Sequence, residues 1–252
     1  MSSPLVPGAA PTAPLRGELR YGLELARLLA DAAFLRPART QDAPPVLLVP
    51  GFMAGDSSLG VLAGWLRRRG SRVGRAGILL NTDCGEREAQ RLEARVERLA
   101  GEAGKRVVLL GQSRGGELAR VVAARNGDAI STLVMLGSPV LGPLEVGPSV
   151  LNAVRSVARL GDLGVPRMFS TACGSGPCCE NYRADLERPV PDSVRAVSIY
   201  SRSDGIVSWQ ACLDPCAEHV EVQSSHTGMS VNVQVYRRLA QILDEEAGRW
   251  TG

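Results

Sequence analysis

The chain has few aromatic residues and only two histidines. Phe, Tyr and Trp make up 4% of its 252 residues, and the histidines are His219 and His226. Aliphatic side chains must therefore build the core, and a hydrophobic content of 44% is enough for a substantial one. Any chemistry that needs a histidine base has two candidates, and a metal site rich in imidazole is excluded.

Long apolar runs and strong charge are also missing. No stretch approaches the roughly 20 apolar residues of a transmembrane helix, and residues 1–20 lack the apolar centre of a secretory signal. The net charge is only +3, and the one basic run, residues 67–69, ends a helical pattern without any nucleic-acid motif. We expect a cytoplasmic protein with no membrane span and no nucleic-acid partner, although a sequence trimmed at its start would leave secretion open.

Apolar runs alternate with helical patterns from residue 46 onward. We predict strands at residues 46–49, 72–80, 107–110, 132–136, 194–200 and 220–222, and helices at 21–35, 58–69, 86–100, from 117, around 150–160 and at 231–246. This alternation predicts a doubly wound, mostly parallel α/β sheet, with ligands bound outside the carboxyl ends of the strands. Residues 1–20, rich in Pro, Ala and Gly, are expected to form a flexible arm, and 21–252 a single domain.

The most specific motif is Gly-Gln-Ser-Arg-Gly-Gly at residues 111–116. An apolar run precedes it and a helical pattern follows it, so Ser113 is predicted on a tight strand-to-helix turn with G-x-S-x-G spacing. Such a turn exposes the serine hydroxyl, and the helix behind it offers free N–H groups to a developing negative charge. Ser113 is the candidate nucleophile.

A serine nucleophile needs a base, and the base needs an acid that orients it. His226 follows the last strand in a polar turn and is the favoured base, whereas His219 lies within a strand pattern and is expected to be structural. Asp204 follows the 194–200 strand and gives the order Ser, Asp, His along the chain. It also suits a turn or helix cap, and Asp185, Asp192 and Asp214 are the other candidate acids.

Acyl transfer also needs two N–H donors for the oxyanion. The backbone N–H of Arg114, next to the nucleophile, is one candidate. The loop after the 46–49 strand should supply the other, and we favour the N–H of Phe52 over that of Met53 because Gly51 permits a turn there. We expect the side chains of Phe52, Met53 and Met229 to contact the substrate.

With these residues in place the chain resembles the α/β-hydrolases, in the serine esterase and lipase branch. The resemblance runs from about residue 46 to the last helix and rests on five segments: 50–52 (Pro-Gly-Phe), 111–116, 136–139 (Leu-Gly-Ser-Pro), 203–207 (Ser-Asp-Gly-Ile-Val) and 225–229 (Ser-His-Thr-Gly-Met). The Arg- and Ala-rich composition is similar to actinobacterial members of that family. The resemblance implies that residues 139–193 form a small cap or lid inserted after the sixth strand.

Two positions depart from the pattern of many such lipases. Gln112 stands before the nucleophile, where His is common, and Arg114 follows it as a bulky cation. We expect Arg114 to pair with a carboxylate of the cap; the alternative is that its planar guanidinium holds a substrate carboxylate or phosphate.

Three of the six cysteines, Cys173, Cys178 and Cys179, crowd into a loop rich in Gly and Pro. The first interpretation is free thiols in packed loops, and the second is a disulfide of Cys173 with Cys178 or Cys179. A zinc site is disfavoured, because the chain has no C-x-x-C pair and only two histidines. We expect no metal and no cofactor.

The combined motifs predict a serine hydrolase that cleaves small-molecule carboxylic esters through an acyl-enzyme on Ser113. Short to medium acyl chains are favoured, because the cap region shows no amphipathic lid helix. One alternative is an acyltransferase or a thioesterase of a biosynthetic route, which would use the same residues. The other is a hydrolase fold that binds a ligand without catalysis. The sequence carries no signal for the oligomeric state.

Overall fold

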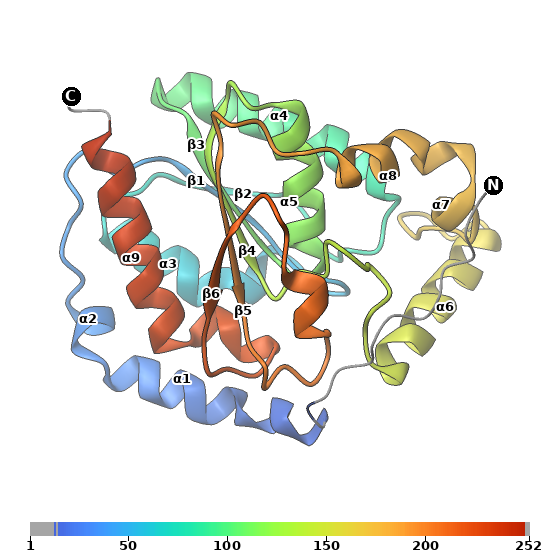
Figure 1. The fold of residues 1–252 in the computed structure, drawn as a ribbon, viewed down its shortest axis with the longest axis horizontal. Helices are drawn as coiled ribbons and strands as arrows, with labels where there is room; N and C mark the ends of the chain where they lie inside the picture. Colours follow the sequence, from blue (N-terminus) through green and yellow to red (C-terminus); the bar gives the residue numbers. More distant parts are fainter. Residues whose placement is uncertain (1–12, 14, 250–252) are drawn as a thin grey trace.

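A parallel sheet of six strands forms the centre of the computed structural model, which describes residues 13 and 15–249 (Figure 1). The strands are β1 (Val46–Val49), β2 (Val73–Arg75), β3 (Val107–Gln112), β4 (Ile130–Leu136), β5 (Arg195–Tyr200) and β6 (Glu218–Glu221). Their spatial order is β2-β1-β3-β4-β5-β6, and all five pairings are parallel. The predicted fold class is therefore confirmed. The second strand is shorter than predicted, since only residues 73–75 pair with β1.

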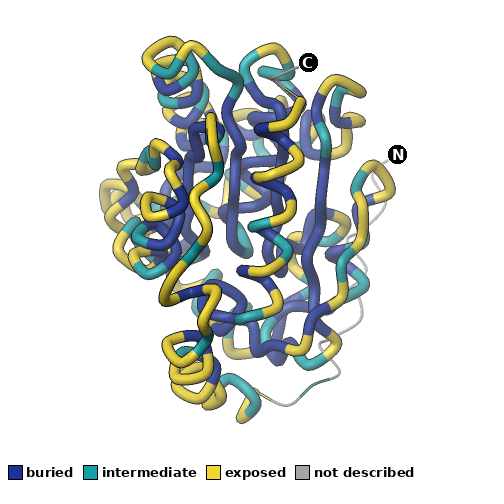
Figure 2. Tube along the Cα trace, turned by 90° about the vertical axis from the view of Figure 1, so that its left-hand side faces the viewer, coloured by how far each residue is buried: buried dark blue, intermediate teal, exposed yellow. Residues whose placement is uncertain are grey.

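Helices cover both faces of this sheet. They are α1 (Tyr21–Ala30), α2 (Ala32–Leu35), α3 (Gly60–Arg68), α4 (Gly85–Ala103), α5 (Arg114–Arg125), α6 (Pro148–Asp162), α7 (Ala172–Ser175), α8 (Glu180–Glu187) and α9 (Val233–Gly248). Successive strand residues point to opposite faces, so Leu48 of β1 packs with α1, α3 and α9, and Leu47 packs with α4, α5 and α8. The four central strands β1, β3, β4 and β5 are buried almost throughout, whereas the edge strands β2 and β6 are more exposed. In Figure 2 the dark blue of buried residues accordingly dominates the inside of the molecule and yellow the periphery.

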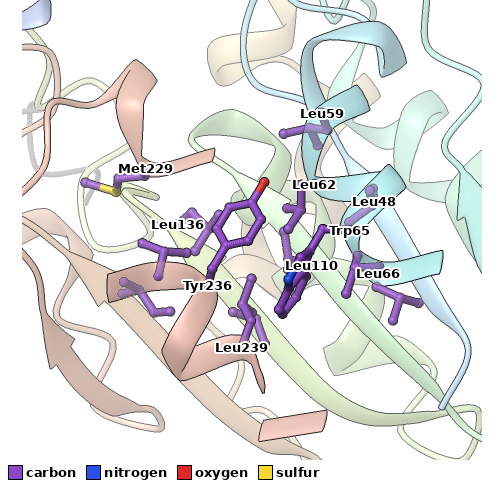
Figure 3. Packing of buried hydrophobic residues seen from close by; sticks show 14 of the residues in the cluster. Leu48, Leu59, Leu62, Trp65, Leu66, Leu110, Leu136, Met229, Tyr236 and Leu239 are labelled. Atoms are coloured by element: carbon purple, nitrogen blue, oxygen red, sulfur yellow. The ribbon is translucent and has the colours of Figure 1, made fainter. Parts of the chain in front are cut away.

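Three aromatic residues pack together in the core on one face of the sheet. The rings of Trp65 on α3 and Tyr236 on α9 lie 4.8 Å apart, edge to face, and Phe34 contacts Tyr236 at 5.6 Å. Figure 3 shows Trp65 and Tyr236 among leucines of the strands and of α3. Edge-to-face pairs add to the free energy gained by burial alone. These rings therefore fix α3 and α9 against the same face of the sheet.

The segment between β4 and β5, whose last helix packs against α4 and α5, extends from the carboxyl edge of the sheet, to the right in Figure 1. It holds α6, α7, a short 3₁₀ helix η3 (Pro177–Cys179) and α8. We call residues 139–193 the insertion. In chain order it follows the fourth strand rather than the sixth, because the described part of the chain has six strands and two of them come after it.

The chain before β1 packs onto the domain rather than away from it. Most of the predicted arm, residues 1–12 and 14, lies outside the described residues, but Leu15–Arg20 forms a 3₁₀ helix, η1, that contacts η5 (Thr227–Val231). The single helix predicted at 21–35 is divided at Asp31, whose carboxylate accepts the N–H of Ala33 at 2.9 Å and caps α2. Within the described residues no helix is both long and apolar enough to cross a membrane.

Candidate active site

Ser113 lies on the turn between β3 and α5, as the motif predicts. Its backbone is in the left-handed region, with φ 53° and ψ −128°, which a residue with a Cβ adopts only at a cost in free energy. The turn is held from both sides: the Ser113 N–H donates to the carbonyl of Leu136 at 2.8 Å, and the Ser113 carbonyl accepts the N–H of Gly116 at 2.8 Å. The serine side chain is half-buried at the N-terminus of α5.

Two glycines make this turn sterically feasible. A side chain on Gly115 would meet the backbone of Val49 and Pro50 at the end of β1, and one on Gly111 would meet the backbone of Gly115. The backbones of β3, α5 and the end of β1 therefore approach one another more closely than a Cβ at these two positions would allow. This explains the G-x-S-x-G spacing physically.

His226 and Asp204 form a buried hydrogen-bonded pair. Nδ1 of His226 lies 2.6 Å from Oδ2 of Asp204, and both side chains are almost inaccessible to solvent. The other carboxylate oxygen of Asp204 accepts the N–H groups of Ile206 and Val207, each at 2.8 Å. Asp204 therefore contacts both its own turn and the imidazole of His226.

The sheet brings Ser113 and His226 to the same edge. The Ser113 N–H bonds to Leu136, and the next residue, Gly137, packs so closely on His226 that a Cβ there would lie 3.1 Å from Nδ1. Both side chains line one cavity. In the described part of the chain no hydrogen bond joins the Ser113 hydroxyl to the imidazole. Such contacts are often long without substrate and shorten when it binds.

The environment of His226 favours its protonated form. Burial lowers the pKa of His226, but the negative charge and hydrogen bond of Asp204, with a smaller contribution from Glu18, outweigh burial and raise the pKa above 6.5. A base with a raised pKa accepts a proton more readily, which suits the removal of a proton from a serine hydroxyl.

Two carboxylates from the N-terminal segment hold the loop that carries His226. Glu18 accepts the N–H of His226 at 2.9 Å and both the N–H and the hydroxyl of Thr227 at 3.0 Å. Glu24 accepts the N–H of Ser225 at 2.8 Å and its hydroxyl at 3.0 Å. Neither glutamate is predictable from the sequence, because their partners lie about 200 residues away and no local motif connects them.

Gln112, one of the two unusual positions, also supports this loop. Its side-chain N–H donates to the carbonyl of His226 at 3.1 Å. Gln112, next to Ser113, thus holds the backbone of His226. Of the other candidates, His219 lies on the edge strand β6, where its Nε2 contacts the carbonyl of Asp214 at 2.7 Å.

The alternative acids are positioned elsewhere. Asp214 is buried against Arg120, with Oδ2 and Nε 2.5 Å apart, and Asp185 pairs with Arg125 at 2.7 Å. Asp192 is exposed beyond α8. Among the acids considered from the sequence, only Asp204 contacts His226 in the described part of the chain.

Two backbone N–H groups beside Ser113 are available to a ligand. Neither the N–H of Phe52 nor that of Arg114 donates a hydrogen bond within the described part of the chain. The N–H of Met53, by contrast, donates to the carbonyl of Asn81 at 3.3 Å. The loop with Phe52 also reaches the nucleophile, since a Cβ on Gly51 would lie 3.3 Å from that of Ser113.

The cavity at this edge measures about 710 Å³, within the range of pockets that enclose small organic molecules. Ser113 and His226 line it at the sheet, and the insertion supplies much of the opposite wall. Apolar lining residues are Phe52, Pro139, Leu144, Val146, Val150, Val154, Ala158, Phe169 and Ile206. The insertion also contributes polar lining residues, among them Arg155, Arg159, Ser170 and Thr171.

Of the three side chains predicted to contact substrate, Phe52 alone lines the cavity. Met53 is 51% exposed, because its left-handed backbone, with φ 55°, turns its side chain outward. Met229 is fully buried behind Gly137 and belongs to the hydrophobic core. The structure thus places the side chains of Met53 and Met229 outside this cavity.

Arg114 is held by the protein, although not by a carboxylate of the insertion. One guanidinium nitrogen donates to the side-chain oxygen of Asn81, and another donates to the carbonyl of Asp83 at 2.6 Å. The guanidinium also lies 5.4 Å from the centre of the Phe169 ring. Arg114 therefore connects the nucleophile turn to the loop before α4 and to the insertion.

Glu117, one turn into α5, is an ionisable group that the sequence analysis missed. Only 7% of the residue is exposed, yet it lines the same cavity. Burial raises the pKa of Glu117 to about 8, although the nearby charge of Arg114 lowers it in part. The side chain therefore carries its proton at neutral pH.

All six cysteines are free thiols in the structure. Sγ of Cys178 lies 3.8 Å from that of Cys173 and 4.0 Å from that of Cys179, whereas a disulfide requires about 2.05 Å. The bond suggested for these three residues is thus not formed here.

No protein-family model matches the chain, and no curated protein sequence matches it. Solved structures do match. The mature lipase BlEst2 from Bacillus licheniformis has a TM-score of 0.59 at 14% identity, and the match covers 82% of this chain and 94% of the lipase. The carboxylesterase CesB (YbfK) from Bacillus subtilis has a TM-score of 0.52 at 13% identity, and the match covers 90% and 98%.

A third match is the alpha/beta hydrolase domain-containing protein 10 from mouse. Its TM-score is 0.53 at 15% identity, and the match covers 82% of this chain and 90% of that one. The chain has the α/β-hydrolase fold. At these identities the likeness shows the fold alone. The resemblance to actinobacterial members of the family stays a prediction, because no sequence match supports it.

Proposed function

We propose that this α/β-hydrolase fold is a serine hydrolase that cleaves small carboxylic esters. The observation that carries the proposal is the juxtaposition of Ser113, on a strained turn, with the buried Asp204–His226 pair at one cavity. Three different strand ends supply these residues, so their meeting at one edge is a property of the whole fold. The solved lipase and carboxylesterase with the same fold support this reaction class.

The first half of the reaction transfers the acyl group to the enzyme. The Ser113 oxygen attacks the ester carbonyl carbon while Nε2 of His226 accepts the hydroxyl proton. Asp204, hydrogen-bonded to Nδ1, favours the tautomer in which Nε2 is free to accept the proton, and it stabilises the imidazolium. His226 then gives the proton to the leaving alcohol as the C–O bond breaks, which leaves an acyl-Ser113 ester.

The second half returns the enzyme to its starting state. His226 removes a proton from water, the resulting oxygen attacks the acyl-enzyme carbonyl, and the proton passes to the Ser113 oxygen as the acid departs. In both halves negative charge develops on the carbonyl oxygen. We assign the stabilisation of that charge to the N–H groups of Phe52 and Arg114, which donate to no described partner, together with the N-terminus of α5.

Short to medium acyl chains are the substrates we propose for this cavity. Its volume of about 710 Å³ is bounded on the far side by α6, whose Val150, Val154 and Ala158 face the interior. A thioester presents the same carbonyl to Ser113, so a thioesterase or an acyltransferase remains the alternative within this chemistry. A panel of matched oxygen esters and thioesters, each with and without an added alcohol acceptor, separates these activities by product.

Labelling with a fluorophosphonate tests the activated serine directly. We expect a single adduct in the intact-protein mass, mapped by peptide sequencing to Ser113, and no adduct in Ser113→Ala or His226→Ala. Ser58→Ala is the matched control, because Ser58 is another serine at the same cavity, and it should label like the unchanged protein. An adduct on another residue, or none in folded protein, contradicts the proposal.

A further inference from the structure

Four thiols meet where the insertion touches the sheet domain. Cys84 directly precedes α4, Cys173 is in α7, and Cys178 and Cys179 are in η3. All four Sγ atoms lie within 4.8 Å of one another. The shortest separation is 3.2 Å, between Cys84 and Cys179, and Cys173 lies 3.8 Å from Cys178.

These separations match a single tetrahedral ion. Zn²⁺ binds thiolate sulfur at about 2.3 Å in a tetrahedron, which places neighbouring sulfurs about 3.8 Å apart. The Sγ–Sγ distances of 3.2, 3.8 and 4.0 Å lie on both sides of this value, and the remaining ones are within 4.8 Å. An iron–sulfur cluster divides its cysteines among several iron atoms and needs a wider arrangement. The donor set, four soft sulfurs, also favours zinc over a hard cation.

The local structure needs a crosslink of this kind. α7 has four residues and buries none of them, and the three residues of η3 bury only Cys179. Apolar burial therefore contributes little to holding this segment in place. A structural zinc site supplies folding free energy where a core cannot.

Neighbouring polar groups hold the segment in the shape that gathers the sulfurs. Arg183 of α8 donates to the carbonyls of Cys173 and Gly176 at 3.2 and 2.9 Å. The Ser170 hydroxyl lies 3.8 Å from Sγ of Cys173. Outer contacts of this type orient the ligands of a metal and offset their charge.

The sequence pattern disfavoured zinc because it lacks a C-x-x-C pair, and the fold removes that objection. Cys173, Cys178 and Cys179 provide three sulfurs from one loop, and Cys84 provides the fourth from the loop before α4. Cys173, Cys179 and Gly85 also line the active-site cavity. An ion held here would fix one wall of that cavity.

We propose that Cys84, Cys173, Cys178 and Cys179 bind one Zn²⁺ that fastens the insertion to the sheet domain. Each thiol loses its proton to solvent as the Zn–S bond forms, so up to four protons are released for each ion bound. No electron transfer is involved. The site is structural and does not depend on the ester-cleaving reaction proposed above.

Metal content measured on the desalted, unchanged protein is the first test. We expect elemental mass spectrometry to find one zinc ion for each chain. A mercurial reagent that blocks the thiols should release this zinc, and a zinc-binding dye should detect it in solution. Protein loaded with Co²⁺ instead should show the strong thiolate-to-cobalt absorption of a tetrahedral sulfur site. This measurement requires no variant and therefore does not depend on whether a variant folds.

Two exposed cysteines provide a matched pair of variants. Cys178→Ser removes a ligand and should lower the zinc content and abolish the cobalt absorption, whereas Cys216→Ser, outside the cluster, should retain one zinc. Equal zinc loss in both variants overturns the proposal. The proposal is also overturned if the protein contains no metal and all six thiols can be titrated. It is overturned as well if the mass of the denatured, unreduced protein is about two or four hydrogens below that of the reduced protein, because this loss indicates disulfides.

Discussion

The carboxylate of Glu18 accepts the backbone N–H of His226 at 2.9 Å, across 208 residues of sequence. A charged acceptor gives a stronger hydrogen bond than a neutral one. The same carboxylate also accepts the backbone N–H groups of Thr227 and Gly205, so it connects the loop of His226 to the loop of Asp204. The segment before the first strand is therefore part of the support of the proposed active site.

Removal of Glu18 should impair catalysis more than stability. Glu18→Ala deletes all of these hydrogen bonds, and we expect kcat/KM for an ester to fall about tenfold, the equivalent of about 1.4 kcal/mol. Glu18→Gln keeps one acceptor oxygen and should restore part of the loss. The measurement is ester hydrolysis by both variants, with thermal unfolding recorded alongside.

Glu97→Gln is the control for Glu18, because it removes a carboxylate from an exposed position on α4. It should leave both kcat/KM and the pH profile unchanged. If Glu18→Ala has the activity of the unchanged protein, the glutamate does not position His226, and its hydrogen bonds serve only to pack the N-terminal segment.

Asp204 combines two roles that two substitutions can separate. Asp204→Asn keeps an oxygen for the N–H groups of Ile206 and Val207 but loses the charge that orients His226. We expect kcat to fall by up to roughly 10⁴-fold with a small change in melting temperature. Asp204→Ala should lose activity to the same degree and stability as well. Full activity in Asp204→Asn would assign the role of the acid to another carboxylate.

The pH dependence of activity follows from the raised pKa of His226. The base works only when neutral, so kcat/KM should rise with pH through a midpoint above 6.5. Asp204 and Glu18 both raise this pKa, so Glu18→Gln should move the midpoint to lower pH. A pH profile of kcat/KM for each protein measures the shift, and a midpoint below 6.5 in the unchanged enzyme contradicts the assignment.

Local sequence patterns were sufficient to locate the strand ends and the residues that follow them. Ser113, Asp204 and His226 are each predicted because a short polar turn follows an apolar run, and parallel strands bring such turns to one edge. The strand β1 was predicted with its observed bounds, Val46–Val49. The position of each turn along the chain was readable, because a strand and its turn are adjacent in sequence.

Contacts between distant segments were not readable in the same way. Glu18 looked like part of a flexible arm, and Cys84 had no cysteine near it in sequence. Met229 follows the His226 turn, yet its side chain enters the core, because the helical turn after the histidine rotates it behind Gly137. The direction in which a loop side chain points depends on tertiary packing, and a local sequence pattern carries no information about that packing.

Stability should depend on pH through Glu117. Its pKa is raised from 4.5 to about 8, so between these values the folded protein binds a proton that the unfolded chain has released. The free energy of unfolding therefore falls as pH rises through this range, by at most about 1.4 kcal/mol per pH unit. Glu117→Gln, which is neutral and similar in shape, should flatten the curve. Denaturant unfolding at several pH values tests this, with Glu97→Gln expected to keep the original slope.

The wall formed by α6 should set the length of the acyl chain. Val154 faces the cavity and is half-buried, so Val154→Phe adds bulk where the far end of an acyl chain would lie. We expect kcat/KM for an eight-carbon ester to fall about tenfold while that for a two-carbon ester changes little, since methylene contacts are worth about 0.8 kcal/mol each. Leu160→Phe, on the same helix but outside the cavity, should leave both values unchanged. Equal losses for both esters in Val154→Phe would show that the substitution disturbs the catalytic residues rather than the acyl site, and α6 would then not determine chain length.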